Sequence, residues 1–404
     1  MVFDVIRQVV ILVGGRGTRL GKHTCATPKP LLPIADGRPF LDYLLESVAR
    51  HGYEEILLLA GYLGDKIENA YAGRQVGGAS VRVLREFTPL GTGGALTLAR
   101  NELDPMFLMM NGDALFDINL RALEETARKA GTKATLALRT VPDGSRYGRV
   151  TEQAGRITAF HEKDTHYTEP CLINGGVYVL KREILECINS LPCSIEQDVF
   201  PRLVSQNDIS GSEFKGYFLD IGLPESLAQG HAELPCIRFK PAVFLDWNIL
   251  VHKVHEHSSP VEILDLEPDV SHTIRRLNDL NYYIFCIAHQ SETPKEFSNI
   301  NSIKQSYREI QYALFIHGAH LDNLIFIKDL LKHNKFEHNT ASYNLSNGSN
   351  LFRCAIHELP VLFDKSFYIT SNAIYSQKAY DAGLDVCLYR GENLSDLIKK
   401  YTLK

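Results

Sequence analysis

The stretch QVVILVGGRGTRL, residues 8–20, joins an unbroken apolar run to a glycine-rich loop. A run rich in β-branched residues is typical of a strand that is buried on both faces of a parallel sheet. The three glycines of the loop allow backbone N–H groups to turn toward an anion, and its two arginines add positive charge. The loop is not a P-loop, because His23 follows Gly21-Lys22, and not a full dinucleotide fingerprint, because Leu20 replaces the third glycine. It predicts a strand that ends in a phosphate-binding loop, with a plain strand-to-helix turn as the alternative.

Strands and helices alternate along the first 235 residues. Apolar runs predict strands at 55–60, 81–85, 106–110, 134–141, 149–152, 156–162, 176–180 and 217–221. Helical periodicity predicts helices at 40–51, 92–103, 119–130, 195–205 and 224–233. This alternation indicates an α/β fold with a mostly parallel, doubly wound sheet. Because ligands bind beyond the carboxyl ends of such strands, we expect functional residues to follow the strands.

The composition suggests two domains that make different demands on their backbones. The chain has 404 residues, 45% hydrophobic and 23% charged, and a prior of ~150 residues per domain suggests two or three domains. Of its 29 glycines, 25 lie in residues 1–235 and 4 in residues 236–404. Glycine is used where the backbone adopts positive φ or approaches a ligand closely. We therefore expect a boundary near Leu234-Pro235 and domains at 1–235 and 236–404.

The sequence also argues against several classes of protein. The net charge of −5 gives no reason to expect nucleic acid or an anionic membrane as partner. No apolar run reaches the ~18 residues of a membrane span, and residues 1–10 do not read as a secretory signal. The eight cysteines are scattered without CxxC or CxC pairs, which is typical of reduced thiols. We expect a cytoplasmic protein.

Three charged residues occupy positions that suit phosphate chemistry. Lys29 lies between Pro28 and Pro30, which hold the backbone extended, and a lysine held in this way suits a point charge aimed at a phosphate. Asp113 and Asp220 each follow an apolar run. Mg²⁺ usually takes one or two carboxylates together with phosphate oxygens, so the two aspartates predict a magnesium site. The alternative is an exposed lysine and two turn-forming aspartates.

Eight short motifs occur in a fixed order along residues 8–233. They read LVGGRGTRL (12–20), PKP (28–30), PLGTGGAL (89–96), NGD (111–113), RYGRV (146–150), FHEK (160–163), NGGVYVL (174–180) and LDIGLPE (219–225). This set resembles the sugar-1-phosphate nucleotidyltransferase family, most closely its D-glycero-D-manno-heptose 1-phosphate guanylyltransferases. The resemblance implies a Rossmann-like, GT-A-like mixed sheet. It also implies transfer of a nucleoside monophosphate, GMP in the first place, to a sugar 1-phosphate, which releases pyrophosphate and forms an NDP-sugar for a surface polysaccharide.

The resemblance also implies a role for each matching residue. The expected catalytic residues are Arg19, Lys29 and Asp113. The expected nucleotide-binding residues are Leu12, Gly14, Gly15, Gly17, Thr18, Glu86, Gly91, Gly93 and Gly94. The expected sugar-phosphate-binding residues are Tyr147, Gly148, Glu162, Lys163, Asn174 and Gly175. Mg²⁺, the expected cofactor, would be held by Asp113 and Asp220. Arg16 departs from many family members, which carry an apolar residue there.

The second domain contains the stretches VFLDWN (243–248), IFCIAHQS (284–291) and AYDAGLDV (379–386). Through these stretches it resembles the haloacid-dehalogenase-like phosphatases, specifically the heptose bisphosphate phosphatase branch. Apolar runs predict strands at 240–248, 282–287, 324–327, 361–362, 367–369 and 386–389, and helical patterns lie at 268–280 and 374–382. We therefore expect a second α/β domain.

The catalytic pattern of that family is incomplete in this chain. Its nucleophile and acid pair, Asp-x-Asp, reads Asp246-Trp247-Asn248, and asparagine cannot act as an acid. Ala288 replaces the expected Thr or Ser. The remaining motifs are also missing: the phosphate-binding lysine near 350–357, the magnesium carboxylate at 370–375 and the zinc cysteines near 324–330. Because these motifs are missing together, we expect a pseudophosphatase domain. His252, His255 and His257 are too irregularly spaced to predict a metal site.

Alternative functions stay open at this point. One is a bifunctional enzyme whose second domain hydrolyses a heptose 1,7-bisphosphate, and another is a regulatory sugar-nucleotide-binding protein without catalysis. The expected substrates are GTP and a sugar 1-phosphate. UTP, CTP, dTTP or ATP could take the place of GTP, and another manno-configured sugar 1-phosphate that of the heptose. The second domain could provide the interface of a homo-oligomer.

Overall fold

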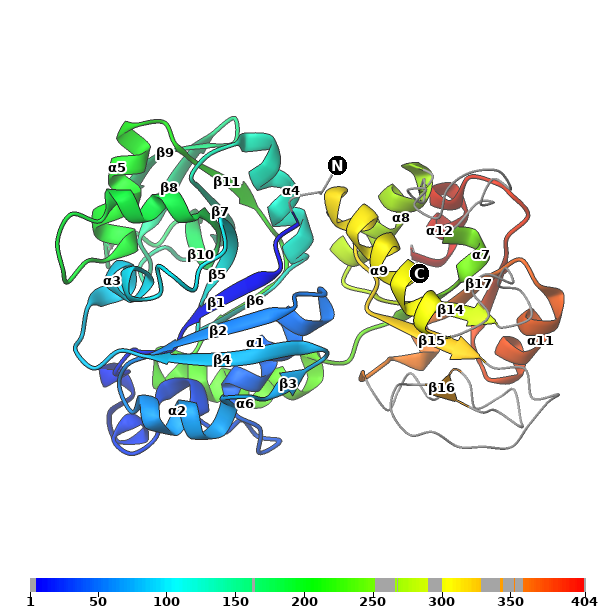
Figure 1. The fold of residues 1–404 in the computed structure, drawn as a ribbon, viewed down its shortest axis with the longest axis horizontal. Helices are drawn as coiled ribbons and strands as arrows, with labels where there is room; N and C mark the ends of the chain where they lie inside the picture. The colour runs from blue at the N-terminus through cyan, green and yellow to red at the C-terminus, as the bar shows by residue number, and fades with distance from the viewer. Residues whose placement is uncertain are drawn as a thin grey trace. The chain divides into compact units, whose positions relative to one another are not determined.

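The computed structural model describes residues 5–161, 164–250, 266, 268–289, 300–327, 342–343, 352 and 359–402. These residues divide into two compact units. The first unit comprises Ile6–Cys236, and the second comprises the described residues from Ile237 onward together with Val5. In each unit, helices flank a β-sheet (Figure 1).

The first unit is built on a ten-stranded mixed sheet. Its strands are β1 (Gln8–Leu12), β2 (Glu55–Ala60), β3 (Gln75–Val76), β4 (Ala79–Arg85), β5 (Met106–Asn111), β7 (Ala134–Val141), β8 (Arg149–Gln153), β9 (Arg156–His161), β10 (Cys171–Lys181) and β11 (Ile209–Glu213). They lie in the order β3-β4-β2-β1-β5-β10-β7-β11-β9-β8. β1 pairs in parallel with β2 and β5, whereas β10 runs antiparallel to β5 and β7. The sheet is therefore mixed rather than mostly parallel.

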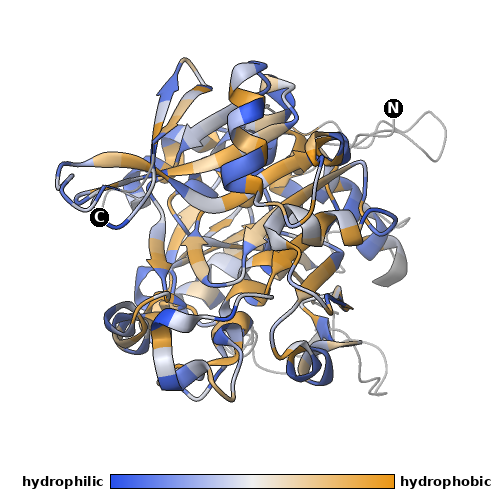
Figure 2. Ribbon diagram, turned by 90° about the vertical axis from the view of Figure 1, so that its left-hand side faces the viewer, coloured by the Kyte–Doolittle hydropathy of each residue, from blue (hydrophilic) through white to orange (hydrophobic). Residues whose placement is uncertain are grey.

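The sheet is covered by helices on both faces. The helices are α1 (Phe40–Arg50), α2 (Gly64–Tyr71), α3 (Gly91–Leu98), α4 (Leu120–Ala130), α5 (Phe200–Ser205) and α6 (Pro224–Ile237). Val9 and Ile11 of β1 belong to one buried core with α1, α2, α4 and α6, and Val10 belongs to another core with α3 and α5. Successive strand residues point to opposite faces, so the all-apolar β1 serves both cores. Figure 2 shows hydrophobic residues concentrated on the strands.

A small second sheet lies beside the main one and orders two of the predicted site residues. It pairs β6 (Ala114–Asp117) with β12 (Tyr217–Asp220) in antiparallel register, with Asp220 opposite Ala114. The amide of Ile221 also donates to the carbonyl of Asp113 at 3.0 Å. The ladder therefore holds Asp113 and Asp220 side by side, although they are distant in sequence.

Several elements differ from the sequence-based expectations. α3 ends at Leu98 rather than at 103, and residues Ile195–Val199 form a π-helical turn before α5. β3, β6 and β11 were not expected, because each is short or polar and gives little periodic signal. β10 begins at Cys171 rather than at 176, and its ladder with β7 is irregular between Asn174 and Tyr178. This irregularity interrupts the alternation from which a strand start is predicted.

The second unit holds a sheet in which all pairings between described strands are parallel. Its strands are β13 (Ala242–Asp246), β14 (Tyr283–His289), β15 (Asn323–Ile327), β16 (Ser342–Tyr343), β17 (Phe367–Thr370) and β18 (Asp385–Leu388), in the order β16-β15-β14-β13-β17-β18. The chain builds outward from β13 in one direction and then in the other. Ligand sites in such sheets lie at the carboxyl ends of the strands where the direction changes, which are here β13 and β17.

Helices also cover both faces of the second sheet. They are α7 (Trp247–Leu250), α8 (Pro268–Asp279), α9 (Ile300–Ile316), α11 (Ala373–Asp381) and α12 (Leu394–Thr402). Val243 and Leu245 of β13 pack in one core with α7, α8, α9 and α12, and Phe244 packs in another with α11. Residues 361–362, expected as a strand, form only an isolated bridge between Val361 and Lys240. None of the helices in the described ranges has the length and apolar character of a membrane span.

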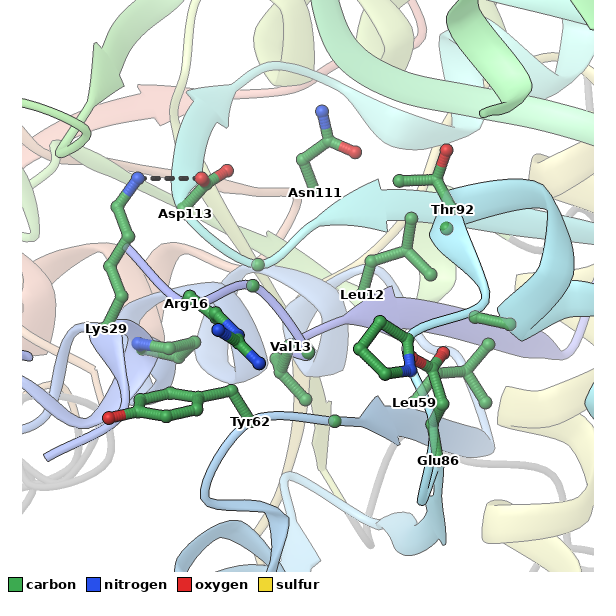
Figure 3. A pocket seen from close by; sticks show the side chains of 18 of the residues that line it. Leu12, Val13, Arg16, Lys29, Leu59, Tyr62, Glu86, Thr92, Asn111 and Asp113 are labelled. Atoms are coloured by element: carbon green, nitrogen blue, oxygen red, sulfur yellow. Dashed lines mark hydrogen bonds and ion pairs between the residues drawn. The ribbon is translucent and has the colours of Figure 1, made fainter. Parts of the chain in front are cut away.

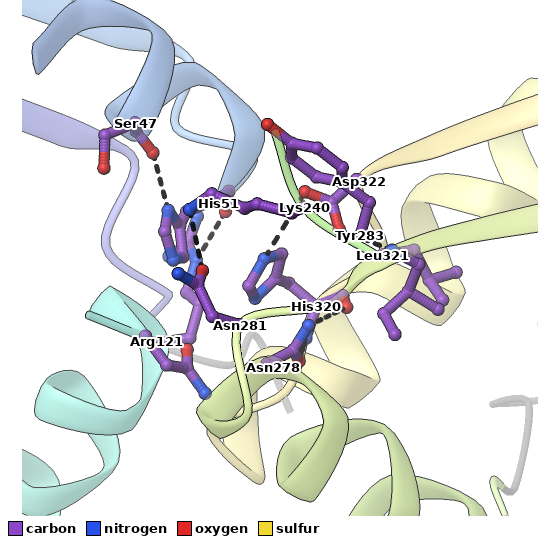
Figure 4. A network of polar contacts seen from close by, with 12 residues as sticks. Ser47, His51, Arg121, Lys240, Asn278, Asn281, Tyr283, His320, Leu321 and Asp322 are labelled. Atoms are coloured by element: carbon purple, nitrogen blue, oxygen red, sulfur yellow. Dashed lines mark hydrogen bonds and ion pairs between the residues drawn. The ribbon is translucent and has the colours of Figure 1, made fainter. Parts of the chain in front are cut away.

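Buried polar side chains tie helices to neighbouring loops inside each unit (Figure 4). In the first unit, Arg121 Nε donates to the carbonyl of His51 at 2.8 Å, and His51 Nδ1 lies 2.6 Å from the carbonyl of Ser47. In the second, Asn278 donates to the carbonyl of His320 at 3.1 Å and accepts from its amide at 2.9 Å. A buried polar group without a partner destabilises a fold, so these bonds fix the ends of α1, α4 and α8.

Gly112 marks the closest approach between β1 and the loop after β5, and it gives a test of this packing. A Cβ at residue 112 would lie 2.5 Å from the carbonyl oxygen of Leu12, to which the Gly112 amide donates at 2.9 Å. We expect Gly112→Ala to lower the free energy of unfolding by about 2 kcal/mol, measured by thermal denaturation. Gly15→Ala is the matched control, because a Cβ there meets nothing within 4 Å. Equal stability of the two variants would contradict this packing.

Candidate functional site

Lys29 joins two strand-end carboxylates in the first unit. It begins a short 3₁₀ turn, Lys29–Leu31. Its Nζ lies 2.7 Å from Oδ2 of Asp113 and 3.6 Å from Oδ1 of Asp220. The lysine side chain is 6% exposed, whereas the side chains of Asp113 and Asp220 are 44% and 27% exposed. A buried ammonium requires such partners, so Lys29 holds the two carboxylates together while each keeps an accessible edge.

Arg19 belongs to the 3₁₀ turn Thr18–Thr24, and its side chain lies near Gly222, in the turn that follows β12. A Cβ at Gly222 would lie 2.8 Å from Asp220 Oδ1, 3.3 Å from Lys29 Nζ and 3.4 Å from an Nη atom of Arg19. The Gly222 amide itself donates to Asp220 Oδ1 at 2.7 Å. The missing side chain at residue 222 therefore leaves space in which two cationic side chains approach one carboxylate.

A cavity of about 600 Å³ adjoins this cluster, within the range typical of small-molecule sites. Its floor is formed by the ends of β1 and β5, and its walls by the loops after β2 and β4 and by the start of α3. The lining residues are Leu12, Val13, Gly14, Gly15, Arg16, Lys29, Pro30, Leu59, Gly61, Tyr62, Glu86, Phe87, Thr88, Pro89, Gly91, Thr92, Ala95, Asn111, Gly112, Asp113 and Glu196.

The charges of the cavity are separated. Figure 3 shows Arg16 and Lys29 on one side, and Glu86 and Thr92 on the other. Glu196 lies on the side of Thr92, because Thr92 Oγ1 donates to Glu196 Oε2 at 2.9 Å. One side therefore carries two cationic side chains, of which Lys29 is paired with the Asp113 carboxylate, and the other offers carboxylate acceptors to hydrogen-bond donors.

The loop between β4 and α3 forms the acidic side and is held at several points. The backbone amide of Glu86 donates to the carbonyl of Ala60 at 2.8 Å. The side-chain Oε1 of Glu86 accepts from the backbone amide of Leu90 at 3.0 Å. Gly91 has φ of 78°, and a Cβ there would lie 2.3 Å from the carbonyl oxygen of Cys193. The Cys193 amide donates to the Leu90 carbonyl at 2.8 Å. This position therefore requires glycine both for its φ and for the close approach.

Two of the predicted sugar-phosphate residues, Tyr147 and Gly175, lie next to the small sheet of β6 and β12. Tyr147 packs edge-on against Phe218 of β12, with ring centroids 6.2 Å apart. Burial raises the pKa of Tyr147, and the Asp220 carboxylate adds to this increase. Asn174 Nδ2 donates to the hydroxyl of Tyr178 at 2.9 Å. A Cβ at Gly175 would lie 2.5 Å from the ring of Phe116, so β10 packs directly on β6.

The structure brings together part of the predicted site. Seven predicted residues line the cavity: Leu12, Gly14, Gly15, Lys29, Glu86, Gly91 and Asp113. Arg19, Asp220, Tyr147, Asn174 and Gly175 lie around the aspartate cluster, outside that lining. The other predicted residues that the structure describes in this unit lie outside the cavity lining. Gly17 packs on Lys29, Thr18 is exposed, and Gly148 lies against the His161 carbonyl. Gly93 packs on Cys193, and Gly94 packs on Leu191. Glu162 and Lys163 lie outside the described residues.

Sequence reasoning missed several lining residues. Tyr62 and Gly61 follow β2, and a Cβ at Gly61 would lie 3.0 Å from the carbonyl oxygen of Gly14. Asn111 and Thr92 were quoted within motifs but given no role. Glu196 lies about a hundred residues after Thr92, and only the fold brings them together. A polar residue directly after a predicted strand was a signal that could have identified Asn111.

Asp113 and Asp220 suit a divalent cation chemically. Both already contact one positive charge, the Lys29 ammonium, Asp113 from the residue before β6 and Asp220 from the end of β12. Among the described residues no cluster of three or more His, Cys, Asp or Glu side chains could hold a metal. Two carboxylates completed by phosphate oxygens are the usual arrangement for Mg²⁺.

The second unit also ends its central strand in a carboxylate, and the side chains around it are buried. The Asp246 carboxylate accepts from the hydroxyl of Tyr368 and, at 2.5 Å, from that of Thr370. His289 Nε2 lies 3.8 Å from Asp246 Oδ1, and its ring stacks on Tyr375 at 3.4 Å between centroids. Burial lowers the pKa of His289 to about 3, so the ring is neutral. Asp246 is 1% exposed and therefore inaccessible to a substrate.

The structure describes some of the other predicted residues of the second unit, and the rest lie outside the described residues. Trp247 and Asn248 begin α7 rather than extending β13, and Ala288 is buried in β14. Thr370 and Asn372 stand where a metal carboxylate was expected. The segment containing His252, His255 and His257 and most of the 350–357 stretch lie outside the described residues.

Comparison with known proteins gives matches to the first unit. Residues 8–235 match the family described as Nucleotidyl transferase. The chain is 37% identical over 229 residues to D-glycero-alpha-D-manno-heptose 1-phosphate guanylyltransferase of Aneurinibacillus thermoaerophilus, covering 56% of this chain and 98% of that protein. It is 36% identical over 232 residues to a mannose-1-phosphate guanylyltransferase of Mycobacterium tuberculosis, covering 56% of this chain and 64% of that protein.

Solved structures agree with these matches. HddC from Yersinia pseudotuberculosis is 29% identical, with a TM-score of 0.51, over 57% of this chain and all of that chain. The same protein complexed with GMP-PN gives the same values.

Proposed function

We propose, because the chain belongs to the Nucleotidyl transferase family, that its first unit is a sugar-1-phosphate guanylyltransferase. It transfers GMP from GTP to a sugar 1-phosphate and releases pyrophosphate. The sugar is D-glycero-D-manno-heptose 1-phosphate, the substrate named for the relative from Aneurinibacillus thermoaerophilus. The related mannose-1-phosphate enzyme makes mannose 1-phosphate the second candidate.

The separated charges of the cavity are the observation that carries this proposal. A nucleoside triphosphate is a strong anion at one end and a set of hydrogen-bond donors and acceptors at the other. Arg16 and Lys29, the latter paired with Asp113, would face the first end, and Glu86 would face the second. The complex of HddC with GMP-PN supports a guanine nucleotide in a protein that is similar over the whole first unit.

The reaction needs positioning and charge neutralisation more than acid–base catalysis. A phosphate oxygen of the sugar 1-phosphate forms a bond to the α-phosphorus of GTP, while the bond from the α-phosphorus to the bridging oxygen breaks and pyrophosphate leaves. The nucleophile is already an anion at neutral pH, so no proton has to be removed. Lys29, which is buried and held by Asp113, and Arg19, which is exposed beside Gly222, stabilise the charge that develops on the phosphate oxygens.

Asp113 and Asp220 would hold Mg²⁺ beside these cations. The ion, when bound, neutralises phosphate charge and orients the transferring group. The two carboxylates have accessible edges and lie within 3.6 Å of a shared cation, Lys29, which supports this role.

Substitution of the aspartates tests the cluster. We expect Asp113→Asn and Asp220→Asn each to lower turnover by about 10³-fold or more, because the charge that holds the cation is lost, with pyrophosphate release as the measurement. Thermal denaturation should show that both variants stay folded. Glu183→Gln, which removes an exposed carboxylate outside the cavity lining, is the matched control and should keep wild-type turnover. Normal turnover in either aspartate variant would contradict the assignment.

Glu86 is proposed to select the base. Guanine presents two adjacent donors, N1–H and the N2 amino group, on one edge, and a carboxylate is an acceptor only. Glu86 lines the cavity, and its Oε1 is fixed by the amide of Leu90 at 3.0 Å. Uracil, thymine, cytosine and adenine lack this pair of donors.

A pyrophosphate-release screen of GTP, UTP, CTP, dTTP and ATP tests base selection. We expect GTP to be preferred with the heptose or mannose 1-phosphate, and Glu86→Gln to reduce kcat/KM for GTP by about tenfold or more. The value for the other nucleotides should change little. Preference for a different nucleotide in the wild type would overturn the choice of GTP, and release with none of them would overturn the enzymatic function itself.

The second unit is proposed to be a haloacid-dehalogenase-like domain without hydrolase activity. Its parallel strand order and the carboxylate that ends β13 support the fold. Attack by Asp246 on a phosphate would require an accessible carboxylate oxygen. Both oxygens accept hydrogen bonds from β17, and the residue is buried.

The full chain provides the test of this second proposal. We expect incubation with heptose 1,7-bisphosphate and Mg²⁺ to release no more inorganic phosphate from the wild type than from Asp246→Asn. The reason is that the buried carboxylate cannot form a phosphoenzyme. Phosphate release that Asp246→Asn abolishes would show a bifunctional enzyme instead.

A further inference from the structure

Glu196 is a cavity residue to which neither the sequence motifs nor the proposed reaction gives a role. It lies in the π-helical turn Ile195–Val199, before α5, and its side chain reaches the cavity wall next to Thr92. Glu196 therefore comes from a different part of the chain than the phosphate and base loops.

Two hydroxyl groups fix the Glu196 carboxylate through one oxygen. Oε2 accepts from Thr92 Oγ1 at 2.9 Å and from Ser194 Oγ at 3.1 Å. Thr92 is itself fixed, because its Oγ1 accepts from the amide of Ile195 at 2.8 Å. Among the described residues, Oε1 of Glu196 accepts no hydrogen bond. The carboxylate is thus oriented by the protein and still has an accepting oxygen available.

The neighbouring groups place Glu196 beside the polar floor of the cavity. The charges of Glu196 and Asp113 both contribute to the raised pKa of Tyr178, which burial raises most. Asn174 also donates to the Tyr178 hydroxyl at 2.9 Å. A ligand group that reaches Glu196 therefore lies between the start of α3 and β10.

An oriented carboxylate oxygen in a substrate cavity suits the hydroxyl groups of a sugar ring. A carboxylate only accepts hydrogen bonds, and a vicinal diol offers two donors to it. In nucleotide-binding folds an acidic side chain commonly contacts ribose hydroxyls in this way. The cavity is also polarised, and an anionic phosphate would be repelled from the side that carries Glu86 and Glu196.

We propose that Glu196 binds a substrate diol through Oε1 and so contributes to substrate selection. This inference rests on the proposed guanylyltransferase function. The diol can come from the ribose of the nucleotide or from the ring of the sugar 1-phosphate, since both carry adjacent hydroxyls. Thr92 and Ser194 act as positioning residues, because they orient the carboxylate through Oε2.

Steady-state kinetics of Glu196→Gln on the full chain separates the two sources. The glutamine is isosteric, and its carbonyl oxygen can still accept from Thr92, but the amide nitrogen in the place of Oε1 only donates and cannot accept from a diol hydroxyl. We expect KM to rise about tenfold or more for one substrate with kcat nearly unchanged. A rise for GTP, together with loss of discrimination between GTP and 2′- or 3′-deoxy-GTP, assigns the ribose. A rise for the sugar 1-phosphate alone assigns the sugar ring.

Glu183→Gln is the matched control, because it makes the same substitution at an exposed residue outside the cavity lining. It should keep both KM values within about twofold of the wild type. Unchanged KM values in Glu196→Gln, or an equal change in Glu183→Gln and Glu196→Gln, would overturn the proposal and leave Glu196 with only its hydrogen bond to Thr92 of α3. Glu196→Asp, which withdraws the carboxylate by one methylene, replaces the glutamine variant if thermal denaturation shows that the latter is unfolded.

Direct binding keeps this test independent of turnover. Equilibrium binding of GTP, deoxy-GTP and the sugar 1-phosphate is measured on the wild type and on Glu196→Gln. A wild type that binds these ligands but releases no pyrophosphate contradicts the proposed function, while the affinity differences still decide the role of Glu196. Equal affinities of the two proteins for every ligand would overturn that role.

Discussion

The ion cluster of Lys29 with Asp113 and Asp220 is the interaction on which the first unit depends. The side chain of Lys29 is 6% exposed, and the two carboxylates that face it compensate for the burial of its charge. Those carboxylates come from the loop after β5 and from the end of β12, and the small antiparallel sheet holds them in register. The same three charges therefore join the turn Lys29–Leu31 to the small sheet, and Lys29 and Asp113 also line the cavity. A substitution at any of these three residues would therefore change both the packing of the unit and the charge beside the cavity.

Much of this arrangement could be predicted from the sequence. β1 and its glycine-rich loop, the strand-end aspartates and the proline-flanked lysine all gave local signals, and the family match confirms the nucleotidyltransferase resemblance. β6 and β11 could not be predicted, because a short strand after a tight turn and a polar strand containing Gly211 lack a periodic pattern. Glu196 could not be predicted either. It lies beside the cavity because the fold brings it into contact with Thr92, and no local sequence pattern indicates a contact between residues so far apart in the chain.

In the second unit, side chains of the protein itself occupy the position at the carboxyl ends of the strands where α/β sheets usually bind ligands. Its strands still change direction at β13, and β13 still ends in a carboxylate. The hydroxyls of Tyr368 and Thr370 satisfy that carboxylate from the neighbouring strand. A charge that would face a substrate in an open site is here part of the core, where its hydrogen bonds stabilise the sheet. That this unit lacks hydrolase activity stays a prediction, which rests on the incomplete motifs of the sequence and on the buried carboxylate.

The contact between Gly91 and Cys193 has a consequence for any exchange of the loop between β4 and α3. The backbones of residues 90–93 and 193 exchange hydrogen bonds, and a Cβ at residue 91 would lie 2.3 Å from the Cys193 carbonyl oxygen. Because these contacts use backbone atoms, a loop taken from another protein can make them with most side chains, provided that it keeps glycine at residue 91. The side chains at 86–89 can therefore vary while the backbone anchor of the loop stays the same.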